Sequence, residues 1–305
     1  MWFLIGYEEQ KMSRTALKTI TAVLAVGGVA LSNRRIRNWA IAKAFKLPPP
    51  ENASVIEKGL TMITPDGVTL VGDLYRPKTD QTYPTILVRT AYGRKFAFNR
   101  SVGYYIAQRG YNLFYQDARG TGDSGGEFVP LSNEKRDGAA TVKWIEQQPW
   151  FNGQIATFGM SYLGYTSNAI AVQNLPTVKA AFTTIAPRTF QDIMYGTGGL
   201  DFATLLGWSM INDQLKRSNF ENQGLSGIWN KLNELIRGIN QPYDALPIAT
   251  ADSVATGDAI PFYQTIIHSS DSASPYWAES ELTESEIAGI DVPVFLSSNW
   301  HDTAL

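Results

Sequence analysis

The feature that most constrains the fold is a serine set between a strand-like and a helix-like stretch. Strand-like residues 155–158 lead directly into residues 159–164, which read Gly-Met-Ser-Tyr-Leu-Gly, and a helical pattern follows. This is the layout of a nucleophile elbow, a sharp strand-to-helix turn that presents a serine, here Ser161. A serine hydroxyl is a weak nucleophile at neutral pH, so geometry must deliver it to a base. A serine that merely caps an ordinary turn is the alternative.

The remaining pattern predicts an α/β fold, with a mostly parallel sheet and flanking helices, because strands and helices alternate. Strands are expected at 56–63, 69–75, 85–89, 111–116, 155–158 and 180–185, and helices at 98–109 and 133–148. Pro-Asp-Gly at 65–67 has the composition of a turn, so the first two strands should form a hairpin.

From residue 187 to about 290 the pattern is mostly helical and includes an amphipathic stretch at 228–239. A strand at 292–297 then resumes, and we expect it to be buried, near a sheet edge that lacks its neighbour and is an aggregation liability. A helical block between two late strands indicates an inserted cap. The expected parts are therefore an N-terminal segment and linker at 1–50, a core at 51–186, a helical cap at 187–290, and a truncated return to the core at 291–305.

Charge is divided unevenly along the chain. Residues 1–46 carry eight Lys/Arg against two Glu, a balance of +6, so the net charge of −2 leaves −8 for the rest. An acidic body argues against a nucleic-acid partner. The basic residues flank an uncharged apolar run at 19–33, which is short for a spanning helix but fits the apolar region of a signal peptide.

We therefore expect membrane contact through residues 12–46, and a protein that is membrane-associated or exported. Residues 34–46 interleave apolar side chains with cations, as an interfacial helix does. An ordinary amphipathic helix packed on the domain is the alternative. If the run spans a bilayer, its richer positive flank lies downstream and keeps the body cytoplasmic. The oligomeric state is left open.

The motifs give no support to a cofactor or a metal. Residues 120–125 match Gly-x-Gly-x-x-Gly, but three residues separate them from the preceding strand, and Asp123 would face the pyrophosphate. A dinucleotide site instead opens directly from strand to helix, so we predict a loop. The chain has no cysteine, and its two histidines, His268 and His301, show no three-ligand spacing with an acid.

An acid for Ser161 is available, but a base is not. Asp302 follows the strand at 292–297, which agrees with the chain order Ser, Asp, His of elbow enzymes. His301 is adjacent to Asp302, and neighbouring side chains leave a strand in opposite directions, so this acid cannot easily orient it. His268 precedes the acid and falls in the cap.

These motifs together resemble the α/β-hydrolases of the cocaine esterase and X-Pro dipeptidyl-peptidase group, which includes α-amino-acid ester hydrolases. The resemblance runs from about residue 55 to residue 305. It rests on Pro-Asp-Gly-Val at 65–68, Asp-Leu-Tyr-Arg-Pro at 73–77, Val-Arg-Thr-Ala-Tyr-Gly at 88–93, Gln-Asp-Ala-Arg-Gly at 116–120, Gly-Glu-Phe at 126–128, the serine motif at 159–164, Leu-Leu-Gly-Trp at 205–208 and Asn-Trp-His-Asp at 299–302.

The resemblance implies a serine acyl hydrolase that acts on small esters, amides or short peptides, X-Pro peptides included. Ser161 would be the nucleophile and Asp302 the triad acid. The Tyr92 hydroxyl and the Tyr162 amide would form the oxyanion hole, where donors stabilise the charge that grows in acyl transfer. The family elbow is Gly-x-Ser-Tyr-x-Gly, which accounts for the glycine at 164.

Some positions depart from the family pattern. Ala91 stands where the family usually has proline, and His301 where it often has tyrosine. The family's triad histidine follows the acid by some tens of residues, and a β-sandwich domain follows it, whereas three residues follow Asp302 here.

We therefore expect this chain to be a fragment that is inactive or weakly active alone, since removing the histidine costs on the order of 10⁶-fold in an unrelated protease. The alternative is a non-catalytic, truncated α/β-hydrolase-like binding module tethered to a membrane. It predicts a genuine stop after residue 305 and a stable fold without a further part.

Overall fold

The computed structural model describes residues 42–43, 46–95, 97–196, 198–217, 243–271 and 273–298. The chain divides into two compact units, Met1–Pro50 and Glu51–Leu305. The helices and strands named below all belong to the second unit. The apolar run 19–33 and the amphipathic stretch 228–239 lie outside the described residues. Within the described ranges, no helix has the length and apolar character needed to cross a bilayer.

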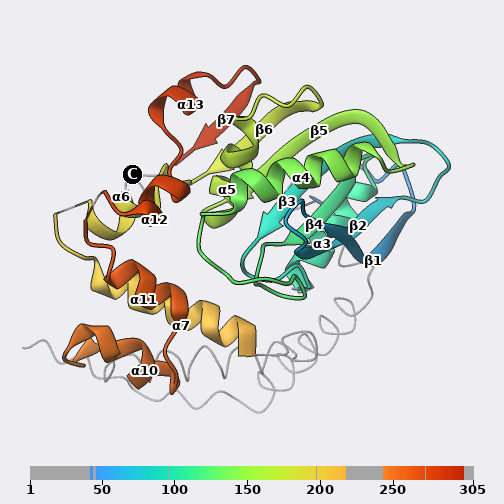
Figure 1. Cartoon of the computed structure of the whole chain (residues 1–305). Helices are drawn as coiled ribbons and strands as arrows, with labels where there is room; N and C mark the ends of the chain where they lie inside the picture. The colour runs from blue at the N-terminus through green and yellow to red at the C-terminus, as the bar shows by residue number, and fades with distance from the viewer. Residues whose placement is uncertain are drawn as a thin grey trace, which may run out of the picture. The chain divides into compact units, whose positions relative to one another are not determined.

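A seven-stranded sheet forms the centre of the second unit (Figure 1). Its strands are β1 (Ser54–Ile63), β2 (Thr69–Pro77), β3 (Tyr83–Thr90), β4 (Asn112–Asp117), β5 (Phe151–Met160), β6 (Val178–Thr184) and β7 (Val294–Ser297), in the spatial order β1-β2-β4-β3-β5-β6-β7. β1 and β2 form the expected antiparallel hairpin, and β2 is also antiparallel to β4. The other pairings are parallel, which confirms the mostly parallel sheet.

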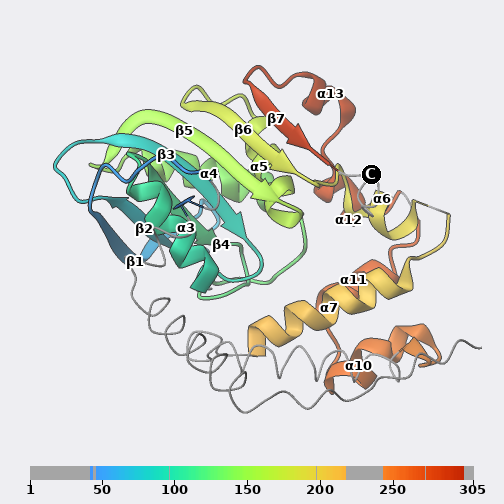
Figure 2. The ribbon, with the colours of Figure 1, turned by 180° about the vertical axis from the view of Figure 1, so that it is seen from behind.

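Helices cover both faces of this sheet. α4 (Glu134–Glu146) and α5 (Tyr162–Ala171) lie on one face, and α3 (Ala97–Ala107) lies on the other, as the opposed views of Figures 1 and 2 show. Two glycines allow close packing. A Cβ on Gly103 of α3 would come within 2.5 Å of the Tyr75 ring, and one on Gly138 of α4 would come within 2.6 Å of Ile170.

The described part of the segment after β6 is mostly helical, as predicted. It contains α6 (Phe190–Tyr195), α7 (Phe202–Arg217), the 3₁₀ turn Ile248–Thr250, α10 (Ala251–Thr256), α11 (Pro261–Ile267), α12 (Pro275–Ser280) and α13 (Glu284–Ala288). Tyrosine hydroxyls connect this layer to the core. Tyr165 Oη donates to the Ser280 carbonyl at 2.9 Å, and Tyr276 Oη donates to the Pro130 carbonyl at 3.3 Å.

The prediction of a buried strand at 292–297 is wrong about burial. β7 forms and pairs in parallel with β6, yet Phe295 is 58% and Leu296 70% exposed. β7 is an edge strand, and among the described elements its main packing partner is β6. The Phe295 ring instead stacks on Phe182 at 4.6 Å between centroids, and Phe182 stacks on Phe158 at 4.8 Å.

Candidate active site

Ser161 sits at the turn between β5 and α5 with an unusual backbone conformation. Its φ of 59° and ψ of −125° lie outside the regions that non-glycine residues normally occupy, a strain that surrounding structure must hold. The Ser161 amide donates to the Thr184 carbonyl at 2.9 Å, and the Ser161 carbonyl accepts from the Tyr165 amide at 3.0 Å. The serine is exposed, so the predicted elbow places its hydroxyl where a substrate can reach it.

Two glycines make this turn sterically feasible. A Cβ on Gly159 would lie 1.9 Å from the Leu163 carbonyl oxygen, a distance at which no side chain fits. A Cβ on Gly164 would lie 2.8 Å from the Ala186 Cβ and 3.1 Å from the Thr184 oxygen. The first turn of α5 therefore folds back onto the end of β5 and packs close to the end of β6.

Tyr92 meets Ser161 because of strand order. β3 and β5 are parallel neighbours, but the chain passes through β4 between them, which makes a topological switch point. Ligands of such sheets bind at the carboxyl ends of the strands beside the switch. Tyr92 follows β3 and Ser161 follows β5, so both lie at this crevice.

The Tyr92 hydroxyl is arranged to act as a donor. It accepts a hydrogen bond from Trp208 Nε1 at 3.2 Å and interacts with Ser161. Burial raises the pKa of the Tyr92 phenol, and the hydrogen bonds to Trp208 and Ser161 oppose this only in part. The phenol therefore stays protonated at neutral pH and keeps a proton to donate.

A buried arginine anchors the Tyr92 loop. Arg94 Nε donates to Asp73 Oδ1 at 3.0 Å, its amide donates to Asp117 Oδ1 at 2.7 Å, and Nη2 donates to Asp123 Oδ2 at 2.6 Å. Nη1 also bonds Asp117. Because charged hydrogen bonds are strong and directional, the loop is tied to β2 and to the end of β4.

The glycine-rich stretch 120–125 is a loop at the carboxyl end of β4, as predicted. Asp117 Oδ2 accepts from the Asp123 amide at 3.1 Å, and a Cβ on Gly122 would lie 2.1 Å from the same carboxylate. Burial raises the Asp117 pKa, which Arg94 opposes. These glycines allow the loop to close on a carboxylate, which is unlike a phosphate cradle.

Aromatic rings surround the tyrosines of the site. The Phe128 ring lies 5.9 Å from Tyr162, 6.1 Å from Trp208 and 5.5 Å from Phe262 between centroids. Trp208 and Phe262 come from α7 and α11 of the helical segment, so core and cap together build an apolar wall.

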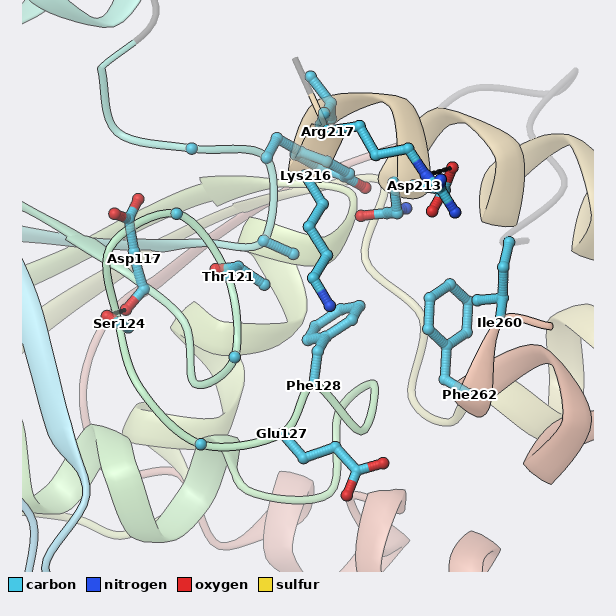
Figure 3. A pocket seen from close by; sticks show the side chains of 18 of the residues that line it. Asp117, Thr121, Ser124, Glu127, Phe128, Asp213, Lys216, Arg217, Ile260 and Phe262 are labelled. Atoms are coloured by element: carbon cyan, nitrogen blue, oxygen red, sulfur yellow. Dashed lines mark hydrogen bonds and ion pairs between the residues drawn. The ribbon is translucent and has the colours of Figure 1, made fainter. Parts of the chain in front are cut away.

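A cavity of about 1120 Å³ adjoins this wall (Figure 3). It is lined by the loop 120–128, the last turns of α7 and the start of α11, together with Tyr92. Ser161 does not line the cavity, whereas Tyr92, which interacts with Ser161, does. Lys216 points into the cavity from α7, while Arg217 pairs with Asp213 at 2.6 Å and with Asp258 at 3.0 Å.

Of the other candidates, only His268 has a described position. Asp302 and His301 lie outside the described residues. His268 is exposed at the end of α11, where its Nδ1 lies 2.8 Å from the Gln264 carbonyl oxygen. No cluster of three metal-ligating side chains occurs among the residues with a described position.

Sequence comparison identifies the family. The profile of X-Pro dipeptidyl-peptidase (S15 family) matches residues 66–305. A cocaine esterase of Rhodococcus sp. (strain MB1 Bresler) is 32% identical over 248 residues, which are 78% of this chain and 42% of that protein.

Solved structures agree at the level of the fold. An aminopeptidase of a marine sediment Thaumarchaeota archaeon superposes with a TM-score of 0.59 at 20% identity, over 82% of this chain and 44% of its own. A CocE/NonD family hydrolase of Staphylococcus aureus gives 0.55 at 16% identity, over 83% and 48%. The chain thus spans less than half the length of these relatives. With an α/β-hydrolase fold and a family match over most of its length, the chain belongs to the X-Pro dipeptidyl-peptidase (S15) family of hydrolases.

Proposed function

We propose that this protein is a serine hydrolase that cleaves esters or amides, X-Pro peptides included, by acyl transfer through Ser161. The observation that carries the proposal is the strained backbone of Ser161 at the β5–α5 turn, with the Tyr92 hydroxyl against it. Strain of this kind persists where the surrounding structure enforces it, and such sites are often functional.

In the proposed reaction, Ser161 Oγ attacks the substrate carbonyl carbon while its proton passes to a histidine base. The carbonyl oxygen becomes an oxyanion that accepts hydrogen bonds from the Tyr92 hydroxyl and the Tyr162 amide. The C–O or C–N bond breaks as the histidine returns the proton to the leaving group. Water then repeats the sequence on the acyl-enzyme and frees Ser161. Asp302 would orient the histidine, as family order implies.

His268 is the one histidine among the described residues, and its ring is not bonded to Ser161. His268 is bonded near Gln264 in the cap, and His301 is next to the acid in sequence. We therefore propose that the 305-residue chain alone hydrolyses substrates weakly or not at all.

The site suits a small substrate with an apolar acyl group. Phe128, Trp208 and Phe262 offer ring faces beside Tyr92, and the adjoining cavity of about 1120 Å³ can hold a further group. Similarity to a protein named as a cocaine esterase supports ester substrates for this chain, and the match to the X-Pro dipeptidyl-peptidase family supports amide substrates.

A fluorophosphonate probe tests the proposal in the full natural chain. We expect stoichiometric labelling on Ser161, loss of labelling in Ser161→Ala, and normal labelling in Ser167→Ala, which changes a buried serine of the helix that follows Ser161. Absence of labelling in a folded full-length protein would refute the assignment of Ser161 as the nucleophile. Parallel measurements with an aryl ester and an X-Pro anilide separate the two substrate classes.

We infer further that the N-terminal segment holds the protein at a membrane or directs its export. The support is the uncharged run at 19–33 with its basic flanks. Cell fractionation, with a deletion of residues 12–46 as the comparison, tests this; an unchanged soluble distribution of both forms would contradict it.

A further inference from the structure

The first residue of α5 is joined to the first residue of α4 by a buried hydrogen bond. The Tyr162 side chain is buried, and its hydroxyl donates to Glu134 Oε1 at 2.8 Å while accepting from the Leu131 amide at 3.4 Å. Burial, and then the Glu134 charge, raise the Tyr162 pKa, so this phenol stays protonated and donates. Tyr162, which follows Ser161, is thus held by two residues outside α5, Glu134 and Leu131.

Glu134 is in turn held by Arg89 of β3. Arg89 Nε and Nη2 donate to Glu134 Oε2 at 3.0 and 2.9 Å, which leaves Oε1 for Tyr162. The side chains of Arg89 and Glu134 are 0% and 3% exposed. A buried ion pair contributes little net stability compared with apolar residues of similar volume. Its presence here favours a role in placing Tyr162.

Arg89 also lies in β3, the strand that leads to Tyr92, whose hydroxyl is the other proposed donor of the oxyanion hole. β3 ends at Thr90, and the Thr90 Oγ1 accepts from the Tyr92 amide at 3.0 Å. The Arg89 carbonyl also accepts from Thr166 Oγ1 of α5 at 3.2 Å. One connected network therefore spans the strand that leads to Tyr92 and the helix that begins with Tyr162.

We propose that Glu134, held by Arg89, is a positioning residue of the oxyanion hole. By fixing the Tyr162 side chain it fixes the amide of the same residue against Ser161 and the Tyr92 hydroxyl. The inference rests on the oxyanion role proposed above for that amide. The amide of the first residue of a helix has no partner within the helix, so its direction depends on such outside contacts.

Tyr162→Phe tests the inference, because it keeps the ring and the amide and removes only the hydroxyl. A displacement of about 1 Å can cost about 10²-fold in rate, and outright loss of an oxyanion donor costs about 10²–10³-fold. We expect kcat of the full natural chain to fall by roughly 10-fold with KM nearly unchanged. Glu134→Gln, which still accepts from Tyr162, should retain more activity than Glu134→Ala.

Tyr165→Phe is the matched control. Tyr165 is buried in the same helix, and its hydroxyl donates to the carbonyls of Ser280 and Leu131, at 2.9 and 3.3 Å, whereas the Tyr162 hydroxyl donates to Glu134. We expect its kcat to stay close to that of the wild type. Equal losses in both variants, or a rise in KM with kcat unchanged, would show a general packing effect and overturn the proposal.

Hydrogen exchange of the backbone at 160–164 gives a readout that needs no activity. We expect faster exchange in folded Tyr162→Phe than in Tyr165→Phe, and unchanged exchange would count against the positioning role. If the full natural chain proves inactive, the proposed function fails while the exchange comparison still decides this inference. Should Glu134→Ala fail to fold, Tyr162→Phe carries the test alone.

Discussion

At the scale of single residues, the backbone conformation of Ser161 depends on its hydrogen bonds and on the absence of a side chain at Gly159. A positive φ at a serine requires compensating contacts, and the Thr184 carbonyl supplies one to the Ser161 amide at 2.9 Å. The rest depends on space, since Gly159 lies against the Leu163 carbonyl where a Cβ would be 1.9 Å away. Glycine at position 159, two residues before the serine, is therefore a steric condition for the elbow.

Gly159→Ala should disrupt the elbow. The added methyl meets backbone atoms, which cannot rotate away as a side chain can, so the cost should reach or exceed the roughly 1–3 kcal/mol typical of overpacking. We expect a lower thermal midpoint and loss of phosphonate labelling. Gly199→Ala is the control, because nothing lies within 4 Å of its added Cβ and its φ is not positive. Similar midpoints for the two variants would refute the steric explanation.

Tyr92→Phe should separate catalysis from binding. The variant keeps the ring and removes the hydroxyl that meets Ser161, so kcat of the full natural chain should fall by about 10²–10³-fold while KM changes little. Steady-state kinetics on one ester measure this. Tyr83→Phe, whose hydroxyl bonds Thr79 and Gln81 at the surface, should behave as the wild type. A kcat of Tyr92→Phe within a few-fold of the wild type would exclude the oxyanion role.

Sequence indicated Ser161 through its motif between a strand and a helix, and Tyr92 through the family resemblance. It did not indicate Glu134 or Arg94, whose partners are far away along the chain. A usable signal was present in Arg89, a charged residue in an apolar run that reads as a buried strand. Such a residue requires a buried partner, but periodicity does not identify which acid provides it.

At the scale of elements, the β1–β2 hairpin is fastened to α4 by charge. Arg119 Nη1 and Nη2 donate to the two oxygens of Asp66 at 2.9 and 3.0 Å, and Arg119 Nε donates to Asp137 Oδ2 at 2.9 Å. Asp66 lies in the hairpin turn and Asp137 in α4. One guanidinium therefore links the turn, the end of β4 and the helix.

Stability should depend on pH through Asp66. Hydrogen bonding with Arg119 holds the Asp66 pKa well below its usual range. A lowered folded-state pKa stabilises above the unfolded value near 3.9, and this contribution is lost as the pH falls through the folded pKa. Asp66→Asn should therefore lower the thermal midpoint at pH 7, with a smaller difference below about pH 3.9. Asp80→Asn, in the exposed turn before β3, is the comparison. An equal difference at both pH values would contradict the linkage.

Most elements could be predicted because apolar periodicity and turn residues act locally. β5 was the exception in length, since it begins at Phe151 and not near 155. Its first residues are exposed or half-buried and include Gly153, so they lack the apolar pattern of a strand. The burial of β7 was predicted wrongly because burial depends on which element covers a strand, and the strand's own sequence does not contain that information.

At the scale of the whole second unit, the site is assembled where core and cap meet. β3 and β5 bring Tyr92 and Ser161 together at the carboxyl ends of the parallel strands. Trp208, from α7 of the cap, donates a hydrogen bond to the Tyr92 hydroxyl. The cap also contacts the core through the Lys135–Glu286 ion pair and through the Tyr165 hydroxyl. Assembly from separate segments explains why local patterns predicted the parts of the site better than their contacts.

The uncovered edge of the sheet should make this chain self-associate. Phe295 and Leu296 of β7 are 58% and 70% exposed, and an edge strand with apolar side chains offers unpaired backbone groups to another copy. We expect the sedimentation coefficient to rise with concentration in the micromolar range. Replacing both residues by lysine should suppress that rise, since charge on an edge strand opposes pairing. Ile63→Lys is the matched control, because Ile63 is 72% exposed on β1 at the opposite edge. A chain that stays monomeric at all concentrations, or an equal response to Ile63→Lys, would show that β7 is not the associating surface.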